Sequence, residues 1–213
     1  MKQSSVLAGI GALAFSVLTI VVLFVANPPG GSYSAHDASK FVSKGHHAAV
    51  FVSTYLIMLA ITGLIVLLAY LRDVTLAGRG GDLSARIFWG TGLAAAACFG
   101  AGWGIMLGNS IAHAFGGKGV VVTPVITYLV SELGAAIIWG PGGFLLGVAL
   151  ITLMLTSRGV LPAWLRWSTL VAGLGGVASV AFFPSALVIL WGIVIGVWLL
   201  VARPTQMQAQ PQH

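Results

Sequence analysis

The chain has 213 residues, of which 58% are hydrophobic and 7% charged, and its mean hydropathy is +1.02. A soluble domain carries about 25% charged residues because water must wet its surface. Here the acidic residues are only four, Asp37, Asp73, Asp82 and Glu132. The composition therefore excludes a water-soluble globular domain and indicates an all-α integral membrane protein.

The formal charge of +6 does not indicate a nucleic-acid partner. The ten basic residues are scattered singly between apolar runs, with no basic cluster and no aromatic platform beside one. The single cysteine, Cys98, excludes an internal disulfide and lies in an apolar run, where it is expected to pack as a small residue.

Six segments are apolar enough to span about 30 Å of hydrocarbon, which takes roughly 20 helical residues. The predicted spans are residues 5–26, 47–70, 86–108, 141–157, 163–183 and 185–202. They form one helical domain, 1–203, followed by a disordered cytoplasmic tail, 204–213. The first span is too long for a signal-peptide core and no Ala-x-Ala-like site follows it, so we expect it to be retained.

The hydrophilic stretch 27–46 separates the first two spans. It opens with Pro28-Pro29-Gly30-Gly31, which cannot be helical. Ser34-Ala35-His36-Asp37 then reads as a capping box, which predicts a short outer helix that stops near Gly45, before the second span.

The apolar run from Val120 to Ser157 is too long for one ordinary span, and Gly140-Pro141-Gly142-Gly143 is expected to break it. Residues 124–139 then form a tilted or interfacial helix before a span at 141–157, or both halves cross separately. With six spans and the N-terminus inside, seven of the ten basic residues and every arginine lie in the cytoplasm, whereas seven spans reverse this bias. The positive-inside rule therefore favours six spans with both termini inside.

Small residues recur every four positions in the third span, at Gly92, Ala96, Gly100, Gly104 and Gly108. Gly192 and Gly196 repeat the pattern in the sixth span. Such faces serve as a dimer interface, as a sliding surface in a transporter, or as packing inside one bundle. We expect packing within the bundle.

Histidines collect on the predicted outer side, which suggests a metal or haem site. Imidazole and carboxylate ligands suit a divalent metal, and the candidate ligands are His36, Asp37, His46, His47, His113 and Glu132. His47 and His113 are also the candidate axial ligands of a b-type haem. Against both sites, no His-x₃-His or Cys-x₂-Cys spacing occurs, and interfacial histidines are often only polar end-markers.

Glu132 lies in an otherwise apolar segment, where a carboxylate is costly and usually serves a purpose. It is a candidate for a proton relay or for a substrate contact, with Tyr128 nearby. The alternative is a solvated position at the outer interface, paired with Lys118. No nucleophile–base pair is apparent in the sequence, which favours a non-enzymatic role.

Several loop and helix-end motifs, Asn27-Pro28-Pro29-Gly30-Gly31-Ser32-Tyr33, His46-His47, Leu161-Pro162-Ala163-Trp164-Leu165-Arg166-Trp167 and Trp191-Gly192, give the chain a familiar pattern. With these motifs it resembles uncharacterised multi-pass membrane proteins common in actinobacteria. The resemblance implies a bacterial inner (plasma) membrane location and no known reaction.

Three functions follow from the sequence, in order of preference. The first is a non-enzymatic accessory subunit or binding protein of a larger membrane assembly, with lipid and other membrane subunits as partners. The second is a proton-coupled transporter that uses Glu132. The third is a haem- or metal-binding redox protein that uses the outer histidines.

Overall fold

The computed structural model describes residues 2–116, 122–181 and 183–201. Within these ranges the chain is helical, and four helical segments are long and apolar enough to cross a membrane. They are α1 (Lys2–Ala26), α3 (His47–Ala77), α4 (Gly81–Phe115) and the segment Pro124–Thr156. The expectation of an all-helical fold is confirmed, and the described residues hold four candidate membrane spans instead of the six predicted.

The fourth long segment is continuous rather than broken. It consists of α5 (Pro124–Ile137), the π-helical turn η2 (Ile138–Gly142) and α6 (Gly143–Thr156). Pro141 lies inside η2, where the wider π turn accommodates the missing N–H and the ring without ending the helix. The predicted break and the predicted start at residue 141 are therefore wrong, because the helix begins at Pro124.

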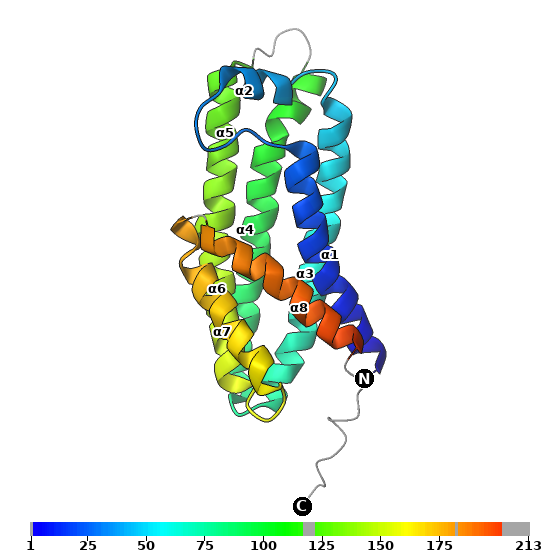
Figure 1. Cartoon of the computed structure of the whole chain (residues 1–213), viewed down its shortest axis with the longest axis vertical. Coiled ribbons are helices and arrows are strands. Elements are labelled where there is room, and N and C mark those ends of the chain that lie inside the picture. The colour runs from blue at the N-terminus through cyan, green and yellow to red at the C-terminus, as the bar shows by residue number, and fades with distance from the viewer. Residues whose placement is uncertain (1, 117–121, 182, 202–213) are drawn as a thin grey trace, which may run out of the picture.

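The last two predicted spans form a short helical hairpin. Helix α7 (Ala163–Val177) has 15 residues and α8 (Ala186–Val201) has 16, with the 3-10 turns η3 (Ser179–Ala181) and η4 (Phe183–Ser185) between them. At 1.5 Å per residue each helix is about 22–24 Å long, less than the hydrocarbon thickness. Figure 1 shows the hairpin beside only about half of the bundle's height.

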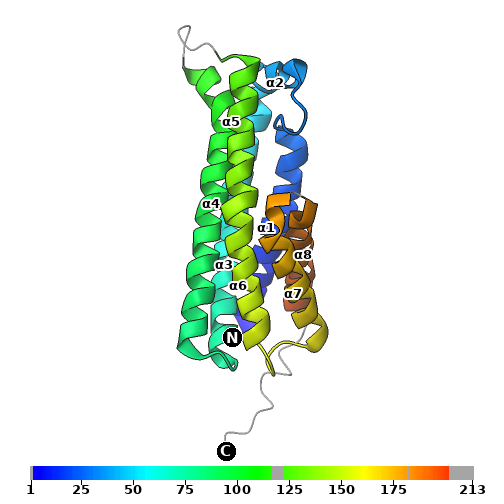
Figure 2. The same cartoon turned by 90° about the vertical axis from the view of Figure 1, so that its left-hand side faces the viewer.

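The long helices form a row in which each packs on its chain neighbour: α1 on α3, α3 on α4, and α4 on α5 and α6. The hairpin covers one side of this row, with α7 against α6 and α8 obliquely across α1 (Figures 1 and 2). We call the end of the bundle where α1 starts and α8 finishes the terminal end, and the opposite end, which carries α2, the distal end.

Paired glycines lie where these helices cross. A Cβ added to Gly11 of α1 would lie 2.5 Å from the carbonyl oxygen of Gly63 of α3, and the reverse distance is also 2.5 Å. Gly102 of α4 and Gly134 of α5 are related in the same way, at 2.6 and 2.5 Å. Only glycine allows backbones this close, and such contacts hold helices together in lipid, where hydrophobic burial contributes little.

The hairpin is attached by the same kind of contact. A Cβ on Gly147 of α6 would lie 2.6 Å from the Gly173 carbonyl oxygen of α7. A Cβ on Gly196 of α8 would lie 3.1 Å from the Gly9 carbonyl oxygen of α1, and a Cβ on Gly192 would clash with the Ser16 side chain. Gly192 and Gly196 thus contact another helix of the same chain.

The small-residue ridge of α4 serves packing at only one end. Gly92 and Ala96 are buried, and Gly92 lies against Leu68 of α3. Gly100 is exposed, and a Cβ on Gly104 or Gly108 would meet no atom within 4 Å. A four-residue step turns an α-helix about 40° beyond one full turn, so the ridge rotates by about 160° from its first residue to its last. Among the described residues, the ridge therefore packs closely at Gly92 and Ala96, whereas Gly104 and Gly108 meet no neighbouring helix.

The predicted outer helix is present as α2 (Ala35–Phe41) at the distal end. Ser34 caps it, because its hydroxyl accepts a hydrogen bond from the Asp37 backbone N–H at 3.3 Å. The helix stops at Phe41, earlier than predicted.

The arginines that the structure describes lie at the terminal end of the bundle. The helix ends and loops at the terminal end carry Arg72, Arg79, Arg86, Arg158 and Arg166. The Arg79 N–H donates to the Thr156 carbonyl at 2.9 Å, which joins the α3–α4 turn to the end of α6. The predicted tail 204–213 lies outside the described residues.

Candidate functional site

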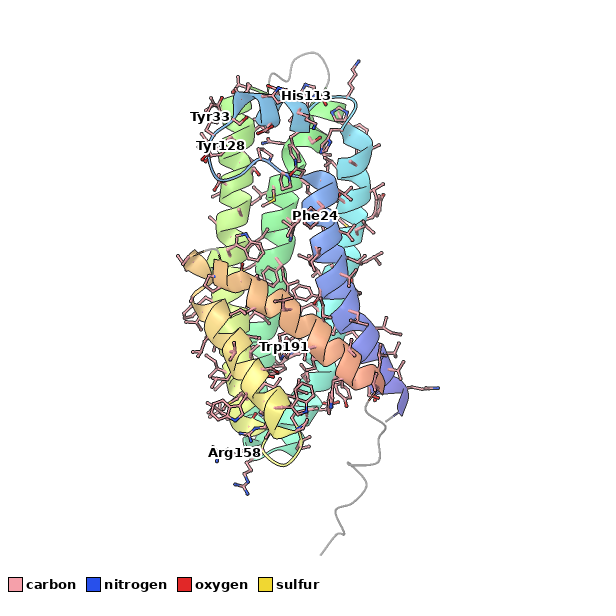
Figure 3. All side chains as sticks on the ribbon, in the orientation of Figure 1. Phe24, Tyr33, His113, Tyr128, Arg158 and Trp191 are labelled. Carbon is pink, nitrogen blue, oxygen red and sulfur yellow. The ribbon has the colours of Figure 1, made fainter. Side chains whose placement is uncertain are left out.

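The predicted site residues gather at the distal end, where His113, Tyr33 and Tyr128 are labelled in Figure 3. Segment 27–46, including α2, covers this end of the bundle and connects α1 to α3 (Figure 1). We call this segment the distal cap. Its contacts show what each predicted side chain does in the folded protein.

Glu132 and Tyr128, one turn apart on α5, hold the same residue of the distal cap. The Gly31 N–H donates to the Glu132 carboxylate at 2.8 Å, and the Tyr128 hydroxyl donates to the Gly31 carbonyl at 2.5 Å. Gly31 has a φ of +72°, a backbone conformation that glycine adopts without a steric penalty. Tyr33 stacks edge-on against Tyr128 with the ring centroids 5.3 Å apart. These contacts fasten the cap to α5.

His46 and His47 also bind backbone groups. The His46 Nε2 lies 2.6 Å from the carbonyl oxygen of Ala26, the last residue of α1. The His47 Nε2 lies 3.0 Å from the carbonyl oxygen of Val42, directly after α2. Each imidazole therefore satisfies a carbonyl that a helix terminus leaves free, which ties the two ends of the distal cap to the start of α3.

His47 and His113 are in direct contact, as the α3–α4 pairing predicts. Their ring centroids are 5.7 Å apart with an interplanar angle of 61°, and the His113 Nδ1 is buried without a partner among the described residues. A bis-histidine haem needs its macrocycle between two imidazoles. Here one ring's edge faces the other ring, and the His47 Nε2 is occupied by Val42. The pair as arranged does not fit a haem.

The six candidate metal ligands do not converge. His36 and Asp37 lie exposed on α2, whereas the Glu132 carboxylate faces Gly31. Within the described ranges, no three side chains of histidine, cysteine, aspartate or glutamate lie close enough together to hold a metal ion.

A groove between α3 and α4 is a second candidate site. Gly100 and Gly104 of α4 and Met58 and Thr62 of α3 line its open side. The buried side chain of Trp103 forms part of its floor. The groove encloses about 660 Å³, its open side included. The glycine repeat of α4 indicated this groove in the sequence. Which neighbour the glycines face could not be predicted, because it depends on how α4 is rotated about its axis.

No known family model, curated protein or solved structure matches the chain. The resemblance to uncharacterised actinobacterial membrane proteins therefore stays an expectation. Function has to be argued from the geometry.

Proposed function

We propose that the chain is a non-enzymatic accessory protein of a larger membrane assembly, and that a transmembrane helix of a partner subunit docks in the α3–α4 groove. The observation that carries the proposal is the exposed face formed by Gly100 and Gly104, which no helix among the described residues covers. Two glycines four residues apart leave a flat strip along which another backbone can approach closely.

The chemistry of the groove favours an apolar helix as the occupant. The Thr54 and Thr62 hydroxyls both donate to carbonyls of their own helix, at 2.9 Å each. These hydroxyls are therefore satisfied within α3 and need no polar partner. Met58 is exposed at the rim, and its flexible side chain adapts to a docking surface.

The same proposal includes an orientation. Both termini lie in the cytoplasm of the bacterial plasma membrane, four segments cross the bilayer, and the α7–α8 hairpin enters from the inside and returns. The support is the placement of the arginines at the terminal end and of Lys40 and Lys44 at the distal end, because positive charge resists translocation.

A proton-coupled carrier is the second candidate. It is favoured by the π turn at Pro141, because π turns inside α-helices are frequent at functional sites. Its proposed proton relay, Glu132, has Gly31 as its hydrogen-bond partner. A carrier that depends on this carboxylate loses proton-coupled flux in Glu132→Gln vesicles, and an unchanged flux would eliminate it.

Cysteine cross-linking in native membranes tests the docking groove. The background is Cys98→Ser, which removes the single cysteine of the chain. Gly104→Cys places a thiol in the groove, and Ala101→Cys, exposed at similar depth but outside the groove, is the control. We expect one oxidation-dependent adduct with Gly104→Cys and none with Ala101→Cys.

Two results would contradict the docking proposal. Adducts of equal yield at both positions, or none at either, would show that the groove is an ordinary lipid-facing surface. An adduct of twice the 22.0 kDa chain mass would show that the groove binds a second copy of this chain and not a different subunit.

A further inference from the structure

A second groove lies between α3 and α4 near the terminal end of the bundle. Ala69, Arg72 and Asp73 of α3 and Trp89 of α4 line it, and it encloses about 620 Å³, its open side included. We call it the terminal groove. It has no lining residue in common with the docking groove.

The depth of the terminal groove matches the boundary between hydrocarbon and headgroups. Thr62 is the middle residue of α3, and Arg72 lies ten residues further along, about 15 Å at 1.5 Å per residue. Cys98 is the middle residue of α4, and Trp89 lies nine residues away, about 14 Å. Half of a hydrocarbon core about 30 Å thick is about 15 Å. With the helix centres at the centre of the bilayer, both side chains therefore lie where phospholipid headgroups begin.

The groove holds one side chain of each charge. The Arg72 guanidinium lies 3.9 Å from the Asp73 carboxylate, and the Asp73 side chain is 75% exposed. At this distance the two groups attract each other without forming a hydrogen bond. Arg86 and Asp82 of α4 lie 2.5 Å apart and do form a hydrogen-bonded ion pair. Arg72 and Asp73 therefore keep more of their hydrogen-bonding capacity for a ligand.

This pair of charges matches a phospholipid headgroup that carries both signs. A guanidinium binds phosphate well, and a carboxylate beside it accepts hydrogen bonds from a primary ammonium. In phosphatidylethanolamine a two-carbon link joins the phosphate to such an ammonium, so neighbouring side chains can bind both groups. The indole of Trp89 adds an aromatic face that attracts a cation and suits the interface.

The other common headgroups fit the groove less well. The trimethylammonium of phosphatidylcholine has no N–H to donate to the Asp73 carboxylate. Phosphatidylglycerol is anionic and brings no positive charge to Asp73, which then repels it.

We propose that the terminal groove binds the headgroup of phosphatidylethanolamine, with the phosphate at Arg72 and the ammonium at Asp73. The inference rests on α3 and α4 crossing a bilayer, and it holds whether or not a partner helix docks at Gly104.

Native mass spectrometry of the full chain tests the inference. The protein is purified in detergent and mixed with equal amounts of phosphatidylethanolamine, phosphatidylcholine and phosphatidylglycerol that have identical acyl chains. We expect adducts with phosphatidylethanolamine to be several-fold more abundant than adducts with either of the other lipids. Because the lipids compete for one protein sample, the ratio of adducts does not depend on the folded fraction.

Matched variants locate the binding site. Asp73→Asn should lower the phosphatidylethanolamine adducts to the level of phosphatidylcholine, and Arg72→Gln should abolish the excess as well. Asp82→Asn and Arg86→Gln remove the same charges at the same end of the bundle but outside the groove, so both should keep the wild-type ratio.

Three results would overturn the inference. The first is equal abundance of the three lipids on the wild-type chain, and the second is an excess of phosphatidylglycerol, which would mean attraction by positive charge alone. The third is a phosphatidylethanolamine excess that Asp73→Asn leaves intact or that Asp82→Asn removes equally.

Discussion

The two ends of the bundle are stabilised by different interactions. Toward the terminal end the hairpin adds α7 and α8 to the long helices, and it is attached through close contacts at glycines, Gly147, Gly173, Gly192 and Gly196. Toward the distal end only the long helices continue, and the cap is held by side chains that bind backbone groups, at Glu132, Tyr128, His46 and His47.

This difference explains where polar residues occur in a chain with so few of them. Glycine contacts need no polar atoms, whereas a non-helical loop exposes N–H and C=O groups that lipid cannot satisfy. Glu132 and Tyr128 of α5, His47 of α3 and His46 of the cap supply those partners. The most conspicuous polar residues of the sequence therefore hold the distal cap in place in the structure.

The largest expected effect is at the attachment of the hairpin. Gly147→Leu forces a side chain against the Gly173 carbonyl and the Val177 amide, 2.6 and 2.5 Å from a Cβ at this position. We expect a loss of about 3 kcal/mol or more, measured by denaturant unfolding in detergent. Gly90→Leu is the control, since its Cβ meets nothing within 4 Å. Equal losses for both variants would contradict the packing described.

Removing the carboxylate that binds Gly31 should loosen the distal cap. Glu132→Ala leaves the Gly31 N–H without its acceptor, and we expect a loss of about 1–2 kcal/mol together with faster proteolysis within residues 27–34. Glu132→Gln keeps a carbonyl acceptor and should lose less. Because Tyr128 holds the same residue, Tyr128→Phe and Glu132→Ala should be non-additive in a double-mutant cycle. Strict additivity would argue against a shared clamp.

A smaller effect is expected at the end of α1. His46→Ala removes the partner of the Ala26 carbonyl, at a cost of about 1 kcal/mol, visible as faster hydrogen exchange in the last turn of α1. The exposed His36→Ala is the matched control and should leave that exchange unchanged. The reverse pattern would contradict the capping role of His46.

The smallest effect on stability is expected at the groove. Gly104→Leu adds a side chain in open space, so the unfolding free energy of the isolated chain should change by less than about 0.5 kcal/mol. A large loss in the isolated chain would show that Gly104 packs within the bundle after all. Loss of co-purification with the partner subunit, without loss of stability, is the combination that docking predicts.

The sequence predicts the membrane class, the first three spans and the short outer helix, because apolar length and capping residues are local signals. The short hairpin was missed because residues 163–183 are apolar enough to span, and composition does not reveal that α7 stops at Val177. The distribution of positive charge does not distinguish a short hairpin from two full spans. In both cases Arg158 and Arg166 lie on the same side of the membrane.

Site residues were predicted to different degrees. The approach of His47 and His113 follows from the pairing of consecutive helices, and the structure places the two rings in contact. The fastening role of Glu132 was not foreseeable, because its partner Gly31 lies 101 positions away and binds through its backbone.

Thiol labelling at the hairpin tip tests most directly whether the α7–α8 hairpin stops inside the membrane or crosses it. In a Cys98→Ser background, Val180→Cys places a thiol at a tip position that is 74% exposed to the surroundings of the bundle. Lys44→Cys and Leu83→Cys mark the distal and terminal ends. With a membrane-impermeant maleimide we expect Lys44→Cys to react in intact cells, Leu83→Cys only after permeabilisation, and Val180→Cys in neither case. Labelling of Val180→Cys in intact cells, at the level of Lys44→Cys, would show that the hairpin crosses the whole membrane and would contradict the account.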